Sequence, residues 1–564
     1  MLKLLREIRV LMTPADKAVM LALIALMVIG GGLEIIGISI LMPVVAVLTK
    51  PELLEQNRFL AMFYQLANPS SLSGFLLTLC GVIIVFYILK NLYLLLLTYW
   101  QSKFIYDKAY RWSVRLYENY LKTEYSYHLN HNSSELLNNI NLLCNITTGV
   151  LLPLMMLISE CIVIAAIVGM LMCFMPFTTL GAGAVLLLLA VGLYLPFKRY
   201  NFGLGRVQME EAQAVFQSLM QGIGGIKEVK VRNLEERFGA LYAGNQRARY
   251  RAEMLLYFSG QFPRLTLETL VVVLAMMLLA LFTVAGMASG TILLTVSLLA
   301  MAMFRLLPAV SRVQYNLVRI RQTLCSFDAI YHDLTRLPRE EKADIAPPIR
   351  FREMLRIENI TFAYEPQGRP VLRNFSAEIP CLSSVAFIGA TGCGKTTLAD
   401  ILLGLLKPQS GRITVDGRDI RENPASWQRQ IGYVPQNIYL LDGTIRSNIA
   451  FGVPEQEIDE DRIAECLEMA QLRSFVDSLP EGVETPVGEL GVRLSGGQRQ
   501  RIGIARALYC RPEVLMLDEA TSALDVDTEQ ALIDALNLLK GRLTILMIAH
   551  RLSTIEQCDR VIRL

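Results

Sequence analysis

The chain has 564 residues, of which 53% are hydrophobic and only 19% are charged. Soluble proteins of this size carry more charge, and a net charge of +3 is too small to indicate a nucleic-acid partner. The ten cysteines form no CxxC pairs, which favours free thiols over a disulfide framework or a zinc site. Long uncharged runs fill residues 1 to about 310, whereas the chain after about 340 alternates polar and apolar residues. The composition therefore predicts two domains, one in a membrane and one in water.

The first half of the chain contains the apolar segments. Residues 1–12 set Lys3, Arg6 and Arg9 among leucines and isoleucines at helical spacing, which predicts an amphipathic helix on the inner membrane face. A membrane-spanning helix needs about 20 apolar residues to cross a hydrocarbon core about 30 Å thick. Six segments satisfy this requirement: residues 19–48, 73–100, 147–174, 177–197, 266–286 and 289–311.

The distribution of basic residues predicts how these six spans are oriented. Lysine and arginine crowd two long connections, about residues 101–143 and 198–260, and are missing from the short turns after the third and fifth spans. By the positive-inside rule, the long connections, both termini and the soluble domain are cytoplasmic. We expect the connections to be helical extensions that turn near residues 128–134 and 222–225. The alternative, a set of buried helices in a large soluble protein, does not explain this asymmetry.

These patterns predict the domain boundaries and the fold class. A membrane domain with cytoplasmic helical extensions covers residues 1–320, a charged linker covers 321–348, and a nucleotide-binding domain covers 349–564. The predicted fold class is a polytopic α-helical membrane domain with six spans, fused to an α/β P-loop domain.

The second domain contains a predicted phosphate-binding loop. Residues 385–388 form an apolar strand, and residues 389–396 match the pattern GxxxxGK[ST]. Its glycines let backbone N–H groups surround the phosphates of ATP, while Lys395 reaches the β- and γ-phosphates and Thr396 can ligate Mg²⁺. The helix expected after the loop directs its positive N-terminus at the same phosphates. The residues predicted to bind nucleotide here are Gly389, Ala390, Thr391, Gly392, Cys393, Gly394, Lys395, Thr396 and Thr397.

A second apolar strand, residues 514–517, leads directly to Asp518 and Glu519. Asp518 has the position of a metal-organising carboxylate, and Glu519 is placed to polarise the attacking water. Taken alone, this pair is equally consistent with an ordinary acidic strand end.

With these motifs in order, residues 355–564 resemble the ATP-binding cassette of ABC transporters. Residues 494–498, LSGGQ, match the family signature, which implies that they cap the γ-phosphate of ATP held by the opposite subunit. The resemblance further implies a metal-linked loop at Gln436, an interface residue at Asp525, a switch histidine at His550 and an adenine-stacking ring at Tyr364. The matching residues of the signature are Ser495, Gly496, Gly497 and Gln498.

The resemblance also implies how the protein assembles and works. A chain with one cassette must pair to complete its sites, so we expect a homodimer with two active ATPase sites, each using ATP and Mg²⁺. ATP binding would close the dimer and hydrolysis would reset it. Residues 485–491, TPVGELG, resemble a loop typical of exporters. A different half-transporter as partner remains open.

Ionisable residues inside membrane spans are costly and are often functional. Lys90, Arg264 and Arg305 lie at broadly similar predicted depth in the second, fifth and sixth spans, where they would suit an anionic head group. The alternative is that Glu34, Glu160 or Glu268 neutralises them in interhelical ion pairs, or that they reach the interface.

The segments around these cations resemble bacterial lipid-linked oligosaccharide flippases, for example residues 86–90, FYILK, and 304–308, FRLLP. The resemblance implies that Lys90, Arg264 and Arg305 meet the pyrophosphate of a polyprenyl-linked glycan, which is moved from the inner to the outer leaflet of the bacterial inner membrane. Two alternatives remain: a multidrug or lipid A-type exporter, and an ATP-gated channel or regulatory subunit.

Overall fold

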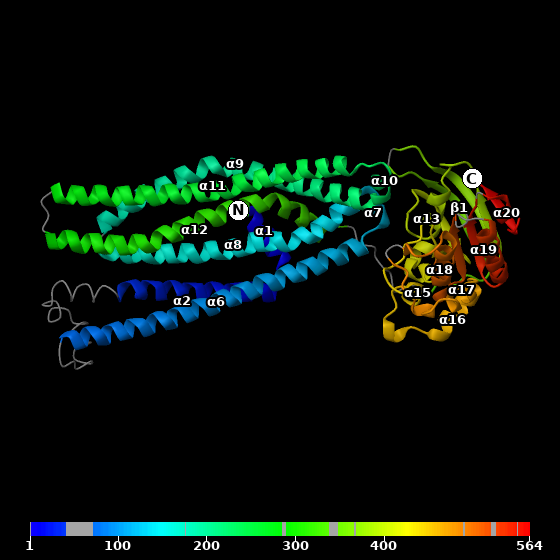
Figure 1. Ribbon diagram of the computed structural model, residues 1–564, viewed down its shortest axis with the longest axis horizontal. Helices are drawn as coiled ribbons and strands as arrows, with labels where there is room; N and C mark the ends of the chain where they lie inside the picture. Colours follow the sequence, from blue (N-terminus) through cyan, green and yellow to red (C-terminus); the bar gives the residue numbers. More distant parts are fainter. Residues whose placement is uncertain are drawn as a thin grey trace. The chain divides into compact units, whose positions relative to one another are not determined.

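The computed structural model describes residues 2–40, 72–174, 176–284, 289–337, 348–365, 368–488, 491–519, 526–549 and 551–564. The chain divides into two compact units. The helical unit comprises residues 1–123 and 130–339, and the cassette unit comprises residues 340–564 together with the short segment 124–129. Figure 1 shows both units.

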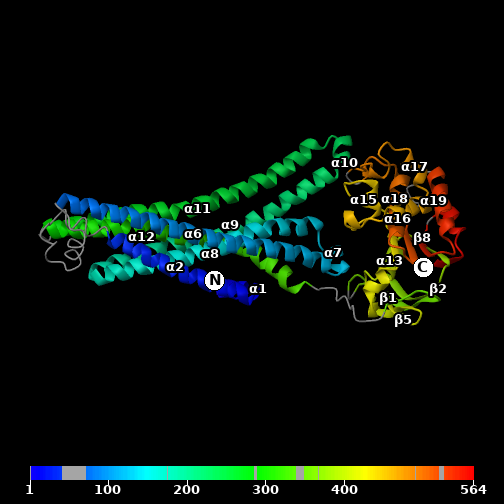
Figure 2. The same cartoon turned by 90° about the horizontal axis from the view of Figure 1, so that it is seen from below.

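Long helices running side by side form the helical unit (Figures 1 and 2). α8 packs mainly on α12 and α9 on α11, while α2 and α6 pack on each other and on α8. The helices are α1 (Leu2–Leu11), α2 (Pro14–Ser39), α6 (Leu72–Lys122), α8 (Ser133–Phe174), α9 (Pro176–Gly224), α10 (Ile226–Val231), α11 (Glu235–Val284) and α12 (Ser289–Arg336). The turns expected near residues 128–134 and 222–225 are present, the first between α7 (Tyr125–Asn130) and α8 and the second between α9 and α10, and their cytoplasmic location stays a prediction.

Among the described residues, three helical segments are long and apolar enough to cross a membrane: Pro14–Gly37, Gly74–Lys122 and Ser133–Met170. They correspond to the first three predicted spans, although residues 41–48 of the first lie outside the described residues. The fourth, fifth and sixth predicted spans fall within α9, α11 and α12, and their crossing of the membrane stays a prediction.

The first turn of α2 is fixed by local capping and by one buried ion pair. The Thr13 backbone N–H donates to Asp16, and the Asp16 N–H donates to the Thr13 hydroxyl. Lys108 of α6 pairs with the same carboxylate, and both side chains are almost fully buried. Because a buried charge needs a partner, this pair ties α2 to α6. α1 buries Leu4 and Ile8 and exposes Val10, as expected of an amphipathic helix.

α12 continues through residues 321–336, which the sequence assigned to the linker. The reason is an apolar stripe at helical spacing, which buries Phe327, Ile330 and Leu334 inside the helical unit. Asp333 on this stretch accepts a hydrogen bond of 2.6 Å from the Tyr120 hydroxyl of α6. Packing and hydrogen bonding therefore hold this part of the predicted linker as helix.

Two sheets form the cassette unit. An antiparallel sheet has the order β2-β1-β4-β5, and a parallel sheet has the order β6-β7-β8-β3-β9. The strands are β1 (Met354–Phe362), β2 (Leu372–Pro380), β3 (Ser384–Ile388), β4 (Ser410–Val415), β5 (Arg418–Asp419), β6 (Ile431–Val434), β7 (Val514–Asp518), β8 (Thr544–Ile548) and β9 (Arg560–Arg563). The α/β fold expected around the P-loop is therefore present, and ligands of such sheets bind at the carboxyl ends of the strands.

Helices surround the parallel sheet and complete two apolar cores. They are α13 (Lys395–Leu402), α14 (Pro424–Gln428), α15 (Ile445–Ile449), α16 (Glu460–Met469), α17 (Arg473–Asp477), α18 (Gly496–Tyr509), α19 (Val526–Leu539) and α20 (Leu552–Ile555). The short helix α7 (Tyr125–Asn130) begins in the segment assigned to this unit. Tyr125 packs against one core, and Glu124 accepts a 2.7 Å hydrogen bond from Lys407.

Candidate nucleotide site

The phosphate loop connects the buried strand β3 to α13. Gly392 and Gly394 have φ angles of 82° and 100°, in the left-handed region that favours glycine. A Cβ on Gly394 would lie 2.8 Å from a methyl of Val371, so both backbone conformation and space require glycine there. The loop can therefore turn its amides inward at the N-terminus of α13.

Lys395 begins α13 with only 6% of its surface exposed. Its ammonium donates to the carbonyl oxygens of Gly389 and Ala390 at 3.1 and 3.2 Å, which holds the charge over the loop where phosphates would bind. Thr396, the predicted metal ligand, is exposed beside it. The predicted adenine platform, Tyr364, is also exposed, and its hydroxyl lies 3.0 Å from the Thr397 hydroxyl.

β7 lies next to β8, which lies next to β3, so Asp518 and Glu519 reach the same edge of the sheet as the loop. Asp518 ends the fully buried strand and is 5% exposed. Glu519 has a φ of 46°, which turns it out of the line of the strand, and its backbone N–H donates to Ile548. The Gln436 amide donates to the Glu519 carboxylate at 2.8 Å, so two residues predicted independently lie in direct contact.

Burial and neighbouring carboxylates raise the pKa of two ionisable groups near this edge. Burial and, to a smaller extent, the neighbouring carboxylate of Asp518 together raise the pKa of Asp400 of α13 to about 6. Burial also raises the pKa of Tyr433 in β6 above its usual range, with the charges of Asp518 and Asp400 adding to the effect. Asp400 was not among the predicted site residues, because an aspartate inside a helix carries no motif.

The signature forms the start of α18. Ser495 and Gln498 cap this helix reciprocally: the Gln498 N–H donates to the Ser495 hydroxyl, and the Ser495 N–H donates to the Gln498 side chain at 2.8 Å. Ser495 and Gly496 are exposed, and Gly497 is buried in the unit. A helix N-terminus presented to solvent is suited to meet an anion that another molecule holds.

Two of the predicted nucleotide-site residues, Asp525 and His550, lie outside the described residues. His550 follows Ala549 directly, and the Ala549 N–H donates to Phe387 of β3.

Of the three cations predicted to contact substrate, Lys90 is described in full. Its side chain is buried, its ammonium lies 3.3 Å from a Glu34 carboxylate oxygen, and it lies 4.5 Å from the centre of the Tyr87 ring. The interhelical pairing considered for these cations is thus formed at Lys90. Arg264 and Arg305 belong to α11 and α12, and their side chains lie outside the described part of the chain.

Comparison with known families decides what this arrangement is. A family model described as "ABC transporter" matches residues 372–522, the stretch that holds the phosphate loop, Gln436, the signature and Glu519. The cassette is an ABC transporter domain. The whole chain has the exporter fold: a solved structure described as a bacterial Atm1-family ABC exporter with ATP bound superposes with a TM-score of 0.78. That superposition covers 97% of this chain and 93% of the other at 23% sequence identity. The chain thus joins one helical unit to one ABC transporter cassette and shares the fold of that exporter.

Curated relatives match a smaller part of the chain. An "ATP-dependent lipid A-core flippase" of Ralstonia nicotianae is 45% identical over 215 residues, and that of Escherichia coli K12 is 44% identical over 205. "Multidrug resistance protein 1" of Entamoeba histolytica is 42% identical over 238 residues. These alignments cover 38%, 36% and 41% of this chain, and 36%, 35% and 18% of the relatives. The chain thus spans about a third or less of the length of the curated relatives it matches.

Proposed function

We propose that this half-transporter assembles as a homodimer in the bacterial inner membrane and uses ATP hydrolysis to move a lipid from the inner to the outer leaflet. The observation that carries this proposal is the hydrogen bond between Gln436 and Glu519 at the edge of the sheet that holds the phosphate loop. An intact loop, a strand-end aspartate and a positioned glutamate are the groups that ATP hydrolysis needs.

Each residue of the site has a distinct role in this mechanism. Lys395 offsets the charge of the β- and γ-phosphates, and Glu519, oriented by Gln436, accepts the proton of the attacking water. Thr396, Gln436 and Asp518 fit a magnesium ion, because all three offer oxygen donors, which Mg²⁺ prefers. When bound, Mg²⁺ would offset charge developing on the phosphates. The exposed signature serine would complete the site of a second copy.

For the substrate, we propose a polyprenyl-pyrophosphate-linked oligosaccharide. Lys90, Arg264 and Arg305 would supply positive charge that suits a pyrophosphate, and Lys90 would contact it by exchanging the Glu34 carboxylate for a substrate phosphate. A second candidate is a lipid A-type glycolipid, because lipid A-core flippases are among the relatives. Both lipids are anionic amphiphiles, so the cations suit either.

A leaflet assay distinguishes the candidates. Fluorescent polyprenyl-pyrophosphate oligosaccharide and fluorescent lipid A are placed in separate proteoliposomes, and ATP-dependent loss of access from one leaflet is measured with Glu519→Gln protein as the blank. Movement of the polyprenyl lipid alone supports the first candidate, and movement of lipid A alone supports the second. ATP hydrolysis without movement of either lipid would contradict both.

A charge-removing pair of substitutions tests Lys90 without leaving a buried charge unpaired. The double variant Glu34→Gln with Lys90→Met removes both charges and keeps the packing volume, so ATP turnover should stay within about twofold of wild type. Movement of the pyrophosphate lipid should fall at least about 10-fold, since charge-assisted hydrogen bonds are among the stronger ones. Lys103→Met, at an exposed position of the same helix, is the control. Unchanged movement in the double variant would remove Lys90 from the substrate site.

A further inference from the structure

A cavity of about 470 Å³ lies among α8, α9, α11 and α12, apart from the cations discussed above. This volume falls in the range of about 300–1,000 Å³ found for small-molecule sites. The stretches of α9, α11 and α12 that line the cavity lie outside the predicted spans 177–197, 266–286 and 289–311. Thr148 and Gly149 of α8 fall just inside the predicted span 147–174, so the cavity lies at the predicted cytoplasmic boundary of the hydrocarbon core.

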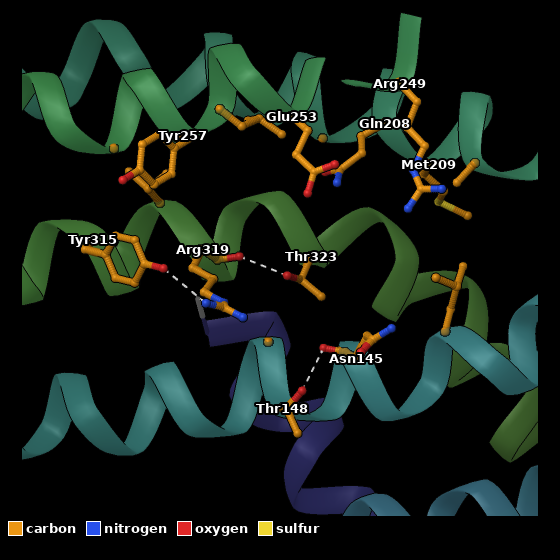
Figure 3. A pocket seen from close by; sticks show the side chains of 17 residues that line it. Asn145, Thr148, Gln208, Met209, Arg249, Glu253, Tyr257, Tyr315, Arg319 and Thr323 are labelled. Carbon is orange, nitrogen blue, oxygen red and sulfur yellow. Dashed lines mark hydrogen bonds between the residues drawn. The ribbon is translucent and has the colours of Figure 1, made fainter. Parts of the chain in front are cut away.

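Three charged side chains line this cavity. Figure 3 shows Arg249 and Glu253 projecting from α11 toward α12, which contributes Arg319. Within the part of the chain that the structure describes, none of the three is in an ion pair. Arg319 donates a 3.1 Å hydrogen bond to the Tyr315 hydroxyl, which orients its guanidinium along α12. Two arginines and one glutamate give the lining a net positive charge.

Arg249 carries the most specific signal. Its Nε is buried and has no hydrogen-bond partner among the described residues. Because Arg249 lines the cavity, the remaining N–H groups of its guanidinium can donate to an acceptor bound there. Arginine binds phosphate through parallel N–H donors, which makes a phosphate group the anion that best suits two guanidinium groups facing one cavity.

The remainder of the lining suits a sugar. Asn145 and Gln208 provide amides that can both donate to and accept from hydroxyl groups, and Glu253 provides an acceptor. Tyr257 and Tyr315 add aromatic faces with polar tips (Figure 3). An apolar drug would leave these polar groups unsatisfied, which disfavours it as a ligand of this cavity.

We propose that this cavity binds a phosphorylated sugar, with Arg249 and Arg319 contacting the phosphate and Glu253, Asn145 and Gln208 contacting the hydroxyls. The sugar phosphate has two sources, the head group of a lipid-linked glycan and a free cytosolic sugar phosphate. The first source rests on the proposed flipping function. The second does not, and it would make the cavity a sensing site.

Binding to the full-length protein, without ATP, tests the proposal independently of transport. Isothermal titration in detergent uses glucose 1-phosphate, inorganic phosphate and glucose, and fluorescence binding in nanodiscs uses a polyprenyl-pyrophosphate disaccharide. Glucose 1-phosphate should bind more tightly than either phosphate or glucose if the site is open to free solutes. Saturable binding of only the lipid-linked probe assigns the site to the head group. Binding of neither phosphorylated probe to protein with normal ATP turnover overturns the proposal, even if leaflet movement is observed.

Two substitutions with opposite expected effects separate a site from a fold defect. Arg249→Gln should weaken binding of the phosphorylated probe at least 10-fold, whereas Glu253→Gln should tighten binding of inorganic phosphate and reduce the preference for glucose 1-phosphate over phosphate. Arg251→Gln, at an exposed neighbouring position that does not line the cavity, should stay within twofold of wild type. Equal affinities in the wild type and in Arg249→Gln, or weaker phosphate binding in Glu253→Gln, would contradict the assignment.

Discussion

Glu519 leaves β7 in the left-handed backbone region and meets the Gln436 amide, which fixes its carboxylate near the phosphate loop. Glu519→Gln keeps the shape and removes the basic oxygen. We expect ATP turnover to fall at least about 100-fold, as is typical when a general base is lost, while ATP binding persists. The measurement is steady-state ATPase activity with nucleotide retention in parallel. Glu468→Gln, an exposed change on α16, is the control, and normal turnover in Glu519→Gln would exclude Glu519 as the base.

Asp400 makes the stability of the cassette depend on pH, since burial beside Asp518 raises its pKa to about 6. The folded protein thus favours the protonated acid, so the stability that Asp400 contributes is present below its unfolded pKa of about 4 and is lost as the pH rises through about 6. Asp400→Asn removes the cost of ionisation and should stabilise the nucleotide-free protein at pH 7.5 by up to about 2 kcal/mol. Thermal unfolding at pH 7.5 and pH 5 measures this, with exposed Asp442→Asn as the control. A gain of equal size at both pH values would refute the ionic explanation.

At the scale of elements, three consecutive glycines in α2 have different surroundings. A Cβ on Gly31 would lie 2.9 Å from Ile162 of α8, whereas a Cβ on Gly32 would meet no atom within 4 Å. Gly31→Leu should therefore force α2 away from α8 and destabilise the helical unit by about 1–3 kcal/mol, the usual cost of overpacking. Gly32→Leu has the same intrinsic gain in helix propensity and serves as the matched control. Thermal unfolding in detergent should separate the two, and equal melting temperatures would mean that this helix contact does not limit stability.

The sequence predicts those site residues whose positions are fixed by neighbouring residues in the chain. It does not predict contacts that depend on the packing of distant segments. Lys395, Asp518 and Glu519 could be predicted because a loop and a strand end fix their positions within a few residues of chain. The pairing of Lys90 with Glu34 could be predicted only as one of several alternatives, because the two positions lie 56 residues apart. Arg249 was predictable only as one of many cytoplasmic basic residues, since nothing in the sequence marks the cavity that it lines.

At the scale of the whole molecule, the proposed homodimer requires each ATP to lie between the phosphate loop of one copy and the signature of the other. Mixed dimers carrying two affinity tags test this in a Glu519→Gln background, where bound ATP is retained. A Lys395→Ala copy paired with a Ser495→Arg copy leaves one composite site intact, because the second copy's loop meets the first copy's signature. A copy carrying both substitutions, paired with a copy carrying neither, damages both sites.

We therefore expect the first mixed dimer to retain about one labelled ATP after desalting and the second to retain nearly none. If each chain instead completed its own site, the order would reverse, since the doubly substituted copy would leave its partner whole. The two preparations contain the same substitutions in equal amounts, so differences in folding or expression cancel. Retention by neither dimer, alongside full retention by the unsubstituted Glu519→Gln dimer, would indicate that the two sites close only together. Such a result would make the dimer, rather than the single cassette, the unit that binds ATP.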